Sequence, residues 1–581
     1  MYGWNGKVSL VAGVSLVLCG HRGRTPVGRS DDWTADMSVE TTTEPFEAQE
    51  YGMGSWQGEA APTFDAGGAS DAAHRIRESC TIVRDPSTGG IGIAFGGELS
   101  APGTAQYPVL ATLPPMYPEW LGDRSFAETH GTRFAYVTGA MANGIATTTL
   151  VSEIARMGGL GFFGSAGLGL AQVEAAIDQL SQGLDGQGLP WGCNLIHSPN
   201  EPALEEAVAD LYLRRGVRKV SAAAYMGLTP AIVRYAYSGV TRDNDGTIHR
   251  RNMVFAKISR PEVARHFINP APVAMLNGLV AAGKLTAVEA ELAAHLPVAE
   301  DITVESDSGG HTDNRPLGPL FSSIQAVRDE LQAVHQYERP IRLGAAGGIA
   351  TPQAAASAFA LGAAYVLTGT VNEACIESGL CADGREMLAQ ADVADITMAP
   401  AADMFELGVD VQVLSRGTMF AIRAKQLYQL YREYPSLEAI PPERAAVVER
   451  TILQSTLDEA WQSTREFFLD RDPAEVERAE ADPHHKMALT FRSYLGLSSR
   501  WAIDGVVARQ LDYQIWCGPS MGAFNSWAAG SFLESASNRT VSQVARNLLE
   551  GAAVISRAQQ LRTYGLPVPS LVFNYRPRPL G

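Results

Sequence analysis

The sequence has few cysteines, fewer basic than acidic residues, and no long apolar run. Its six cysteines form no Cys-x-x-Cys pair and show no metal-ligand spacing, so we expect no metal site and reduced thiols in a cytoplasmic protein. Lysine and arginine number 46 against 63 acidic residues, and the resulting net charge of −17 argues against a nucleic-acid partner. No stretch of about 18 apolar residues occurs, so no transmembrane helix or membrane partner is predicted.

The first 75 residues have the composition of a disordered leader. Residues 20–75 are rich in Gly, Thr, Ser, Asp and Glu and poor in aliphatic side chains, and we expect order to begin near Ile76. An apolar run at residues 8–19 imitates a signal peptide. Lys7 is the one basic residue just before that run, and Leu18 is a poor lipoprotein cleavage context, so a disordered leader or a misplaced start is favoured over export.

Residues 76–125 predict a small β element and a connector. The segments 80–83 and 91–95 are β-prone, and a proline-rich stretch at 114–118 forms a rigid link.

From residue 126 to 400, short apolar runs alternate with amphipathic helical patterns. The predicted strands are 134–138, 160–163, 191–195, 219–223, 253–257, 302–305, 341–343 and 365–368. The predicted helices are 147–157, 171–180, 203–214, 230–237, 319–335 and 352–361. Thr229-Pro230 and Thr351-Pro352 each place a capping hydroxyl before proline at the first helical position, and Gly362 is a credible stop.

Eight strands with intervening helices have the rhythm of a TIM-type (β/α)8 barrel, and we interpret residues 259–300 as a helical insertion. A doubly wound sheet shows the same alternation and stays an alternative. Beyond about residue 402 the β signal fades. Residues 401–581 are predicted to form a mainly helical cap or substrate domain, with helices at 417–434, 442–468 and 541–562.

The most polar strand-end loop is 305–315, which follows the sixth predicted strand. Gly309 and Gly310 let the backbone approach a ligand closely, and His311 follows them among acids and hydroxyls. A lone histidine is often structural, but its place at a barrel mouth makes His311 the catalytic candidate. Asp307, Thr312 and Asp313 are candidates for holding its ring.

Two glycine-rich loops follow the last two predicted strands, one with Ala346, Gly347 and Gly348 and the other with Gly369 and Thr370. Glycine exposes backbone N–H groups beside the positive end of a helix, which suits a phosphate. This pairing predicts a phosphate-bearing cofactor.

Three earlier strand ends carry weaker signals. The run after the first strand, which includes Ala140, Met141, Ala142 and Asn143, has small residues that leave room for a flat ring, although taken alone it is better explained as a tight turn. Asn194 can donate and accept toward a ring amide. Lys257 needs an anion if it is buried, and a reduced flavin is one such anion, whereas a lysine reaching solvent needs none.

These motifs together resemble the nitronate monooxygenase and FMN-dependent enoyl reductase superfamily. The segments that carry the resemblance include Ala140-Met141-Ala142-Asn143-Gly144-Ile145, Cys193-Asn194-Leu195, Ser308-Gly309-Gly310-His311, Ala346-Gly347-Gly348-Ile349 and Gly369-Thr370. Blocks at 118–123, 307–313, 399–406 and 516–525 are similar to those of the PfaD-type trans-acting enoyl reductases of polyunsaturated fatty acid and polyketide synthases. The resemblance covers residues 76–565.

The resemblance implies that residues 126–400 form a barrel that binds FMN, and that NADPH reduces this FMN. The implied substrate is a 2-enoyl thioester on an acyl carrier protein domain of a synthase. His311 would supply a proton or polarise the thioester carbonyl. A nitronate monooxygenase and a non-catalytic subunit that binds acyl carrier protein are the alternatives. The pathway, the acyl chain, the proton donor and the oligomeric state stay open, a homodimer being one option.

Overall fold

The computed structural model describes residues 54–101, 106–198 and 201–581. Residues 1–53 of the predicted leader, with the apolar run at 8–19, lie outside this range. Residues 54–75 are ordered and form β1 (Ser55–Gln57) and α1 (Ala66–His74), so disorder was the wrong prediction for them. The polar composition of this segment gave no sign of two sets of side chains that pack in the core. Trp56 is buried and donates its indole N–H to the carbonyl of Gly96 at 2.8 Å, and α1 buries a face of alanines.

Eight parallel strands close into a barrel in the order β12-β13-β15-β16-β6-β7-β8-β9. The strands are β6 (Tyr136–Thr138), β7 (Leu160–Phe163), β8 (Trp191–Ile196), β9 (Lys219–Ala223), β12 (Met253–Ile258), β13 (Asp301–Glu305), β15 (Arg342–Ala346) and β16 (Tyr365–Thr368). Most of their residues are buried, as expected of parallel strands covered on both faces. The predicted TIM-type barrel is confirmed, and its closure rules out the doubly wound sheet.

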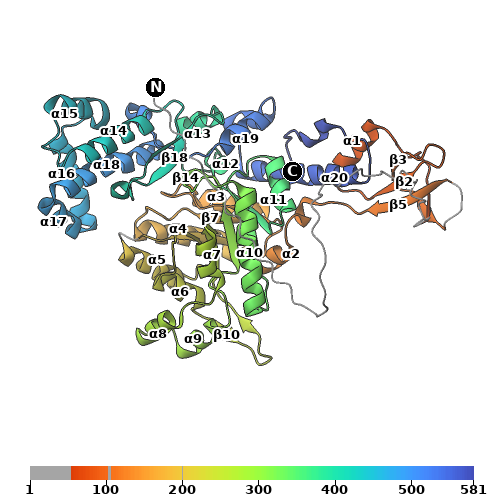
Figure 1. The fold of residues 1–581 in the computed structure, drawn as a ribbon, viewed down its shortest axis with the longest axis horizontal. Helices are drawn as coiled ribbons and strands as arrows, with labels where there is room; N and C mark the ends of the chain where they lie inside the picture. The colour runs from red at the N-terminus through yellow and green to blue at the C-terminus, as the bar shows by residue number, and fades with distance from the viewer. Residues whose placement is uncertain (1–53, 102–105, 199–200) are drawn as a thin grey trace, which may run out of the picture. The chain divides into compact units, whose positions relative to one another are not determined.

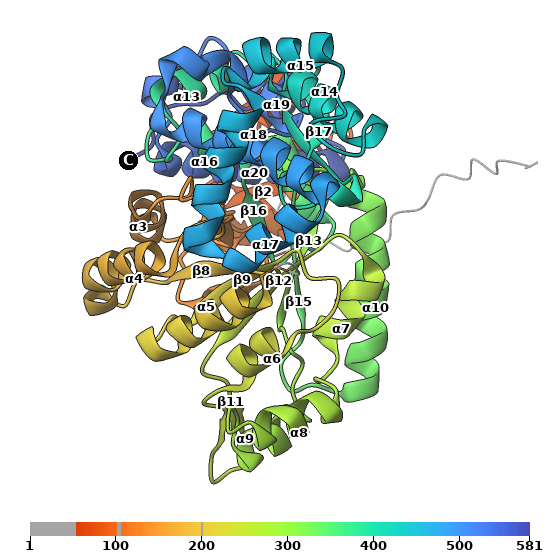
Figure 2. The same cartoon turned by 90° about the vertical axis from the view of Figure 1, so that its left-hand side faces the viewer.

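Helices cover the outside of the barrel (Figure 2). They are α3 (Thr148–Met157), α4 (Leu170–Leu184), α5 (Pro202–Arg215), α6 (Pro230–Tyr237), α7 (Pro261–Ile268), α10 (Leu317–His335) and α11 (Pro352–Ala360). The short α12 (Thr370–Glu373) follows β16. Thr229 and Thr351 cap α6 and α11 through their hydroxyls, as their place before proline predicts. These caps start both helices directly after loops at the barrel mouth.

The predicted insertion at 259–300 divides into two parts. Helix α7 packs against α10 and so belongs to the barrel's ring of helices. Helices α8 (Val273–Ala281) and α9 (Ala287–Ala293) are additional and contact α6 (Figure 2). The sequence of α8 is apolar except for Asn277 and Gly278, too little to form a polar face, so its pattern predicted no amphipathic helix.

The N-terminal element is a five-stranded sheet ordered β3-β2-β5-β1-β4. Its further strands are β2 (Cys80–Arg84), β3 (Ile91–Phe95), β4 (Glu98–Ser100) and β5 (Tyr107–Leu113). Helix α1 packs on α20 (Val541–Thr563), and α20 also packs on α11 of the barrel. Arg77 donates to both oxygens of buried Glu550 at 2.6 Å, and Arg578 donates to Oε1 at 3.1 Å. One late helix therefore joins the N-terminal element to the barrel.

The rest of the chain forms a helical lobe with a small sheet, in the order β14-β18-β17. Its strands are β14 (Gly310–His311), β17 (Ile396–Pro400) and β18 (Asp410–Leu414). Its helices are α13 (Ala382–Ala389), α14 (Phe420–Glu433), α15 (Pro442–Val448), α16 (Leu457–Arg471), α17 (Pro473–Ala481), α18 (Pro483–Asp504) and α19 (Ser520–Ala528) (Figure 1). Because β17 pairs with β18, the predicted boundary at residue 400 falls inside this sheet.

The helix predicted over 442–468 is interrupted. Helix α15 runs into the π-helical turn η4 (Glu449–Leu453), and Gln454 takes a left-handed conformation with φ 58°. Thr456 then starts α16 with a capping box to Glu459. The left-handed residue and the new N-terminal cap therefore divide the predicted helix into two.

The bottom of the barrel, where the strands begin, is closed by a buried charged group. Asp301 accepts from Arg342 Nε at 2.6 Å and Nη2 at 2.9 Å, and its Oδ2 lies 3.0 Å from His130 Nε2. The aromatic rings of Phe126 and Tyr365 stack above them at 4.6 Å between centroids.

Candidate active site

The loop after β13 is held by the helical lobe. Gly310 and His311 form β14, which pairs antiparallel with β18, so that His311 lies opposite Val411. Nε2 of His311 lies 3.2 Å from Oδ1 of Asp403, and 44% of the His311 side chain is exposed. The predicted catalytic histidine therefore stands at the barrel mouth with a carboxylate partner from the lobe.

Asp403 is itself held as a carboxylate. Partial burial by itself would raise the pKa of Asp403, whose side chain is 55% exposed, but the hydrogen bond and charge of His311, with the charge of Arg492, hold that pKa below its ordinary value. The pair is therefore a carboxylate–imidazole arrangement.

The three residues predicted to hold the His311 ring have other partners. Asp307 accepts from Asn314 and Gln412, each at 2.9 Å, while Thr312 Oγ1 accepts from the backbone of Ser308 and Asn314. Asp313 accepts from Ser259 at 2.6 Å and from two nitrogens of Arg260 at 2.8 Å. These residues shape the loop, so their predicted role at the ring was wrong.

Asp313 shows how strongly the loop is tied. The hydrogen bond from Arg260 is the main influence that lowers its pKa, partial burial opposes it, and the result is about 2.

The paired glycines serve this packing as well. A Cβ at Gly309 would lie 2.8 Å from the backbone nitrogen of Cys517, so the chain packs closely against one side of this glycine. Gly310 takes φ +81°, a conformation that favours glycine.

Lys257 reaches the mouth and meets an anion of the chain. Its Nζ donates to Oε1 of Glu305 at 2.8 Å, and Ser308 Oγ donates to the same oxygen at 3.2 Å. Glu305, at the end of β13, was not predicted as this partner. A flavin is therefore not needed to neutralise Lys257.

Asn194 and the loop after β6 support each other across the mouth. Oδ1 of Asn194 accepts from the backbone of Ser165 at 2.8 Å and of Ala166 at 3.2 Å. Asn143 takes φ 57°, donates its backbone N–H to Ala166, and donates Nδ2 to Ser499 of α18 at 3.1 Å. The neighbours Ala140, Met141 and Ala142 are partly buried on this turn. The structure thus brings these predicted residues together in one connected rim.

The two glycine loops after β15 and β16 are the predicted phosphate site, which we call the anion cradle. Gly347 and Gly348 take φ +79° and +69°, and a Cβ at Gly347 would lie 2.6 Å from the carbonyl oxygen of Ser306. Nothing lies within 4 Å of a Cβ built at Gly348 or at Gly369. Two open glycines therefore sit at neighbouring strand ends, where a ligand can reach the backbone.

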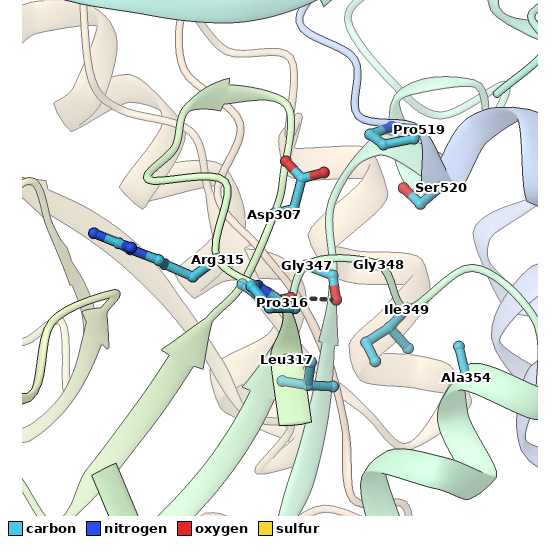
Figure 3. Close-up of a pocket in the computed structure, with 11 residues that line it drawn as sticks. Asp307, Arg315, Pro316, Leu317, Gly347, Gly348, Ile349, Ala354, Pro519 and Ser520 are labelled. Atoms are coloured by element: carbon cyan, nitrogen blue, oxygen red, sulfur yellow. Dashed lines mark hydrogen bonds between the residues drawn. The ribbon is translucent and has the colours of Figure 1, made fainter. Parts of the chain in front are cut away.

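A cavity of about 290 Å³ lies beside the first of these loops. Its lining includes Asp307, Gly348 and Ile349 together with Pro519 and Ser520 at the start of α19, while Arg315, also at its edge, extends its side chain away from the loop (Figure 3). Thr370 Oγ1 accepts from the backbone of Gly518, 3.4 Å away, so the lobe covers both loops.

A buried acid stands next to the second loop. Glu373 on α12 is 3% exposed, and its Oε1 has no hydrogen-bond partner among the described residues. Burial raises the pKa of Glu373 to about 8, so this carboxyl is neutral at neutral pH. A neutral carboxyl does not repel a phosphate as a carboxylate would.

Sequence reasoning missed the partners that come from far along the chain, Asp403 for His311 and Glu305 for Lys257. The block at 399–406 that carried the family resemblance includes Asp403 and was the one signal for it. Within the described residues, no cluster of three or more His, Cys, Asp or Glu side chains is arranged to hold a metal. None of the described helices is long and apolar enough to span a bilayer.

Comparison with known proteins gives two adjacent family matches. Residues 126–416 match the nitronate monooxygenase model, and residues 434–513 match the inserted helical domain of acyl-carrier-protein S-malonyltransferase. The chain also aligns with the enoyl reductase domain of MlnA from the macrolactin cluster of Bacillus amyloliquefaciens. That alignment has 35% identity and a TM-score of 0.73, and covers 77% of this chain and 99% of that domain.

The chain belongs to the nitronate monooxygenase family, in its PfaD-type enoyl reductase branch. The relatives of this PfaD-type chain include a polyunsaturated fatty acid synthase polypeptide of Thraustochytrium sp., 46% identical over 79% of this chain and 31% of the relative. Polyketide biosynthesis protein PksE of Bacillus subtilis is 42% identical over 77% of this chain and 58% of its own length. The PfaD-type chain thus spans under two thirds of these relatives.

Proposed function

We propose that the protein is an FMN-dependent enoyl reductase that uses NADPH to reduce 2-enoyl thioesters on an acyl carrier protein. The supporting observation is the alignment over 99% of the MlnA enoyl reductase domain, at 35% identity. This alignment takes in 77% of the chain, more than the nitronate monooxygenase match at 126–416 alone. The extra coverage favours enoyl reduction over nitronate oxidation.

The residues at the mouth fit FMN. Gly348 and Gly369 leave their backbone open, and Thr351 and Pro352 start α11 directly behind the first loop. Backbone N–H groups at a helix start favour a phosphate. We assign the phosphate to Ala346, Gly347, Gly348, Gly369 and Thr370, and the ring to the rim of Ala140, Met141, Ala142, Asn143 and Asn194. Gly310 and the Lys257–Glu305 pair border that rim, and Gly309 supports the loop from behind.

FMN, when bound, supplies hydride transfer from NADPH to the β-carbon of the enoyl thioester. The chain must supply a proton to the α-carbon and hold the thioester carbonyl. His311 suits both tasks because an imidazole exchanges protons near neutral pH. With Nε2 directed at Asp403, the Nδ1 nitrogen of His311 is the atom left for the substrate.

The acyl carrier protein is the proposed partner because the relatives are parts of fatty acid and polyketide synthases. The match of residues 434–513 to the inserted domain of an acyl-carrier-protein transferase supports the same partner. We therefore assign carrier recognition to the helical lobe.

The test is a purified protein assayed for bound flavin and for NADPH oxidation with crotonyl-acyl carrier protein. We expect a yellow protein that consumes NADPH with this substrate and not with butyryl-acyl carrier protein, which has no double bond to reduce. NADH in place of NADPH tests the choice of reductant.

Two results would replace the proposal. Oxygen-dependent turnover of a nitronate without enoyl reduction would make the protein a monooxygenase. A colourless protein that binds acyl carrier protein would make it a non-catalytic subunit.

A further inference from the structure

The segment that carries Asp403 is anchored by one arginine of α18. Arg492 donates from Nε to the carbonyl oxygen of Ala402, the residue before Asp403, at 2.8 Å. Its Nη1 donates to Oε2 of Glu406 at 3.2 Å. A single guanidinium therefore holds the chain on both sides of the carboxylate that faces His311.

The Glu406 partner of Arg492 is in turn held by the buried side chain of His485. The other oxygen of Glu406, Oε1, lies 3.0 Å from Nδ1 of His485, and Nε2 of His485 lies 2.9 Å from Oε2 of Glu475. The His485 side chain is 3% exposed, and Glu406 and Glu475 are each 27% exposed. Both ring nitrogens of His485 therefore lie within hydrogen-bond distance of a glutamate oxygen. One continuous network of polar contacts therefore links Arg492, Glu406, His485 and Glu475.

The other charged groups near the His311 loop are engaged elsewhere. Asp313 is bound by Arg260 and Ser259, and Asp307 by Asn314 and Gln412. Arg315 extends away from the glycine loop (Figure 3). Asp403 is the acid that the structure places in hydrogen-bond range of the His311 ring.

We propose that Arg492 is a positioning residue of the active site, which acts through Asp403 to hold His311 in its working orientation. This inference rests on the proposed function, since it gives His311 a part in enoyl reduction. Arg492 makes no hydrogen bond or ion pair with the described residues of the proposed flavin rim or the glycine loops. Its effect on catalysis passes through the backbone of Ala402 and through its charge.

The geometry sets two consequences of losing Arg492. Without its anchor, the 402–406 segment moves away from His311, which frees Nε2. Without its positive charge, Asp403 becomes easier to protonate, so the carboxylate is lost at a higher pH than in the native protein.

The experiment compares Arg492→Gln, Asp403→Asn and the double variant with the native holoenzyme. Arg465→Gln is the control, because Arg465 lies in the same lobe and pairs with Glu480, away from Asp403. The first readout is the pH profile of kcat/KM with crotonyl-acyl carrier protein. The second is the rate at which diethylpyrocarbonate labels His311, measured by peptide mass spectrometry.

For Arg492→Gln we expect the acid limb of the profile to move to higher pH, with kcat reduced more than KM is raised. His311 should be labelled several-fold faster. Asp403→Asn should show the same faster labelling, and adding Arg492→Gln to it should change nothing further. If Arg492→Gln does not fold, Arg492→Lys serves in the labelling test, because lysine cannot hold Ala402 and Glu406 together.

A fall in kcat with an unmoved acid limb and unchanged labelling would reduce Arg492 to a structural tie and overturn the proposal. Additive effects in the double variant would overturn it as well, since they would mean that Arg492 does not act through Asp403. The labelling needs no turnover, so it still decides the matter if the protein reduces no enoyl thioester.

Discussion

The two ends of the barrel treat charged groups in opposite ways, and strand β13 takes part in both. Its first residue, Asp301, is 1% exposed and is bound by Arg342 and His130. Its last residue, Glu305, meets Lys257 at the mouth, where the two side chains are 17% and 26% exposed. Removing one partner of a buried ion pair is strongly destabilising, because the remaining charge has neither a partner nor water around it. The pair at the mouth keeps access to solvent, so losing one partner costs much less. The bottom end is therefore built for stability, and the top end can exchange partners.

The largest expected effect is at the bottom. Asp301→Ala leaves Arg342 buried without its carboxylate, and we expect it to lower the free energy of unfolding by about 3–5 kcal/mol. Chemical denaturation followed by circular dichroism measures the change. A loss below about 1 kcal/mol would break the contrast between the two ends.

The same pair predicts acid sensitivity. Burial would raise the pKa of Asp301, but the charges of His130 and Arg342 and their hydrogen bonds hold it well below the ordinary range. A depressed carboxyl pKa stabilises the fold at pH values above that of the unfolded chain, about 3.9, and the contribution is lost as pH falls further. Stability should therefore decline below about pH 4, and less steeply in Asp301→Asn.

At the mouth, the largest effect should be on turnover rather than on folding. His311→Ala should keep its FMN and lose enoyl reduction by about 10²–10⁴-fold, the range of an acid–base group. Flavin absorbance and NADPH consumption are read on the same sample. Unchanged turnover would remove His311 from the mechanism.

A smaller effect should follow from filling the anion cradle. Gly348→Ala places a methyl group where a ligand approaches the loop, and we expect FMN affinity to fall by about tenfold. The matched control is Gly96→Ala in the N-terminal sheet, where φ is +63° and nothing lies within 4 Å of the added Cβ. Both variants carry a left-handed strain of about 1–2 kcal/mol, so equal FMN affinity in the two would count against the cradle.

The smallest effect should come from Glu305, at the mouth end of β13. Glu305→Gln removes the partner of Lys257, yet we expect the free energy of unfolding to change by less than about 1 kcal/mol. The measurement is the denaturation used for Asp301→Ala. A loss as large as at Asp301 would mean that the mouth is as rigid as the base.

Local patterns were enough to predict the barrel. Each of its eight strands is a short apolar run followed by a helical period or a polar loop, and Thr351 before Pro352 marks the start of α11 within one residue. The glycine loops were also predictable, because a glycine pair at a strand end has a local cause in backbone conformation.

Long-range partners were not predictable in this way. Asp403 lies 92 positions beyond His311, and no spacing rule connects a histidine on one loop to a carboxylate on another element. The packing of the Cys517 backbone against Gly309 was not predictable either, because nothing local in the sequence reveals it. The composition of residues 54–75 likewise concealed Trp56, whose burial depends on the strands around it.

The packing of α20 on α1 has a consequence for biosynthesis. Arg77, just after α1, and Glu550, on α20, are 473 positions apart, so their ion pair joins segments that are very distant in sequence. At about 5–20 residues per second, a ribosome needs about 25–95 seconds to make the intervening chain. During that time the N-terminal element has emerged without α20, which packs on its helix α1. The nascent chain is therefore most exposed to aggregation before α20 is made, and chaperone demand should concentrate in that interval.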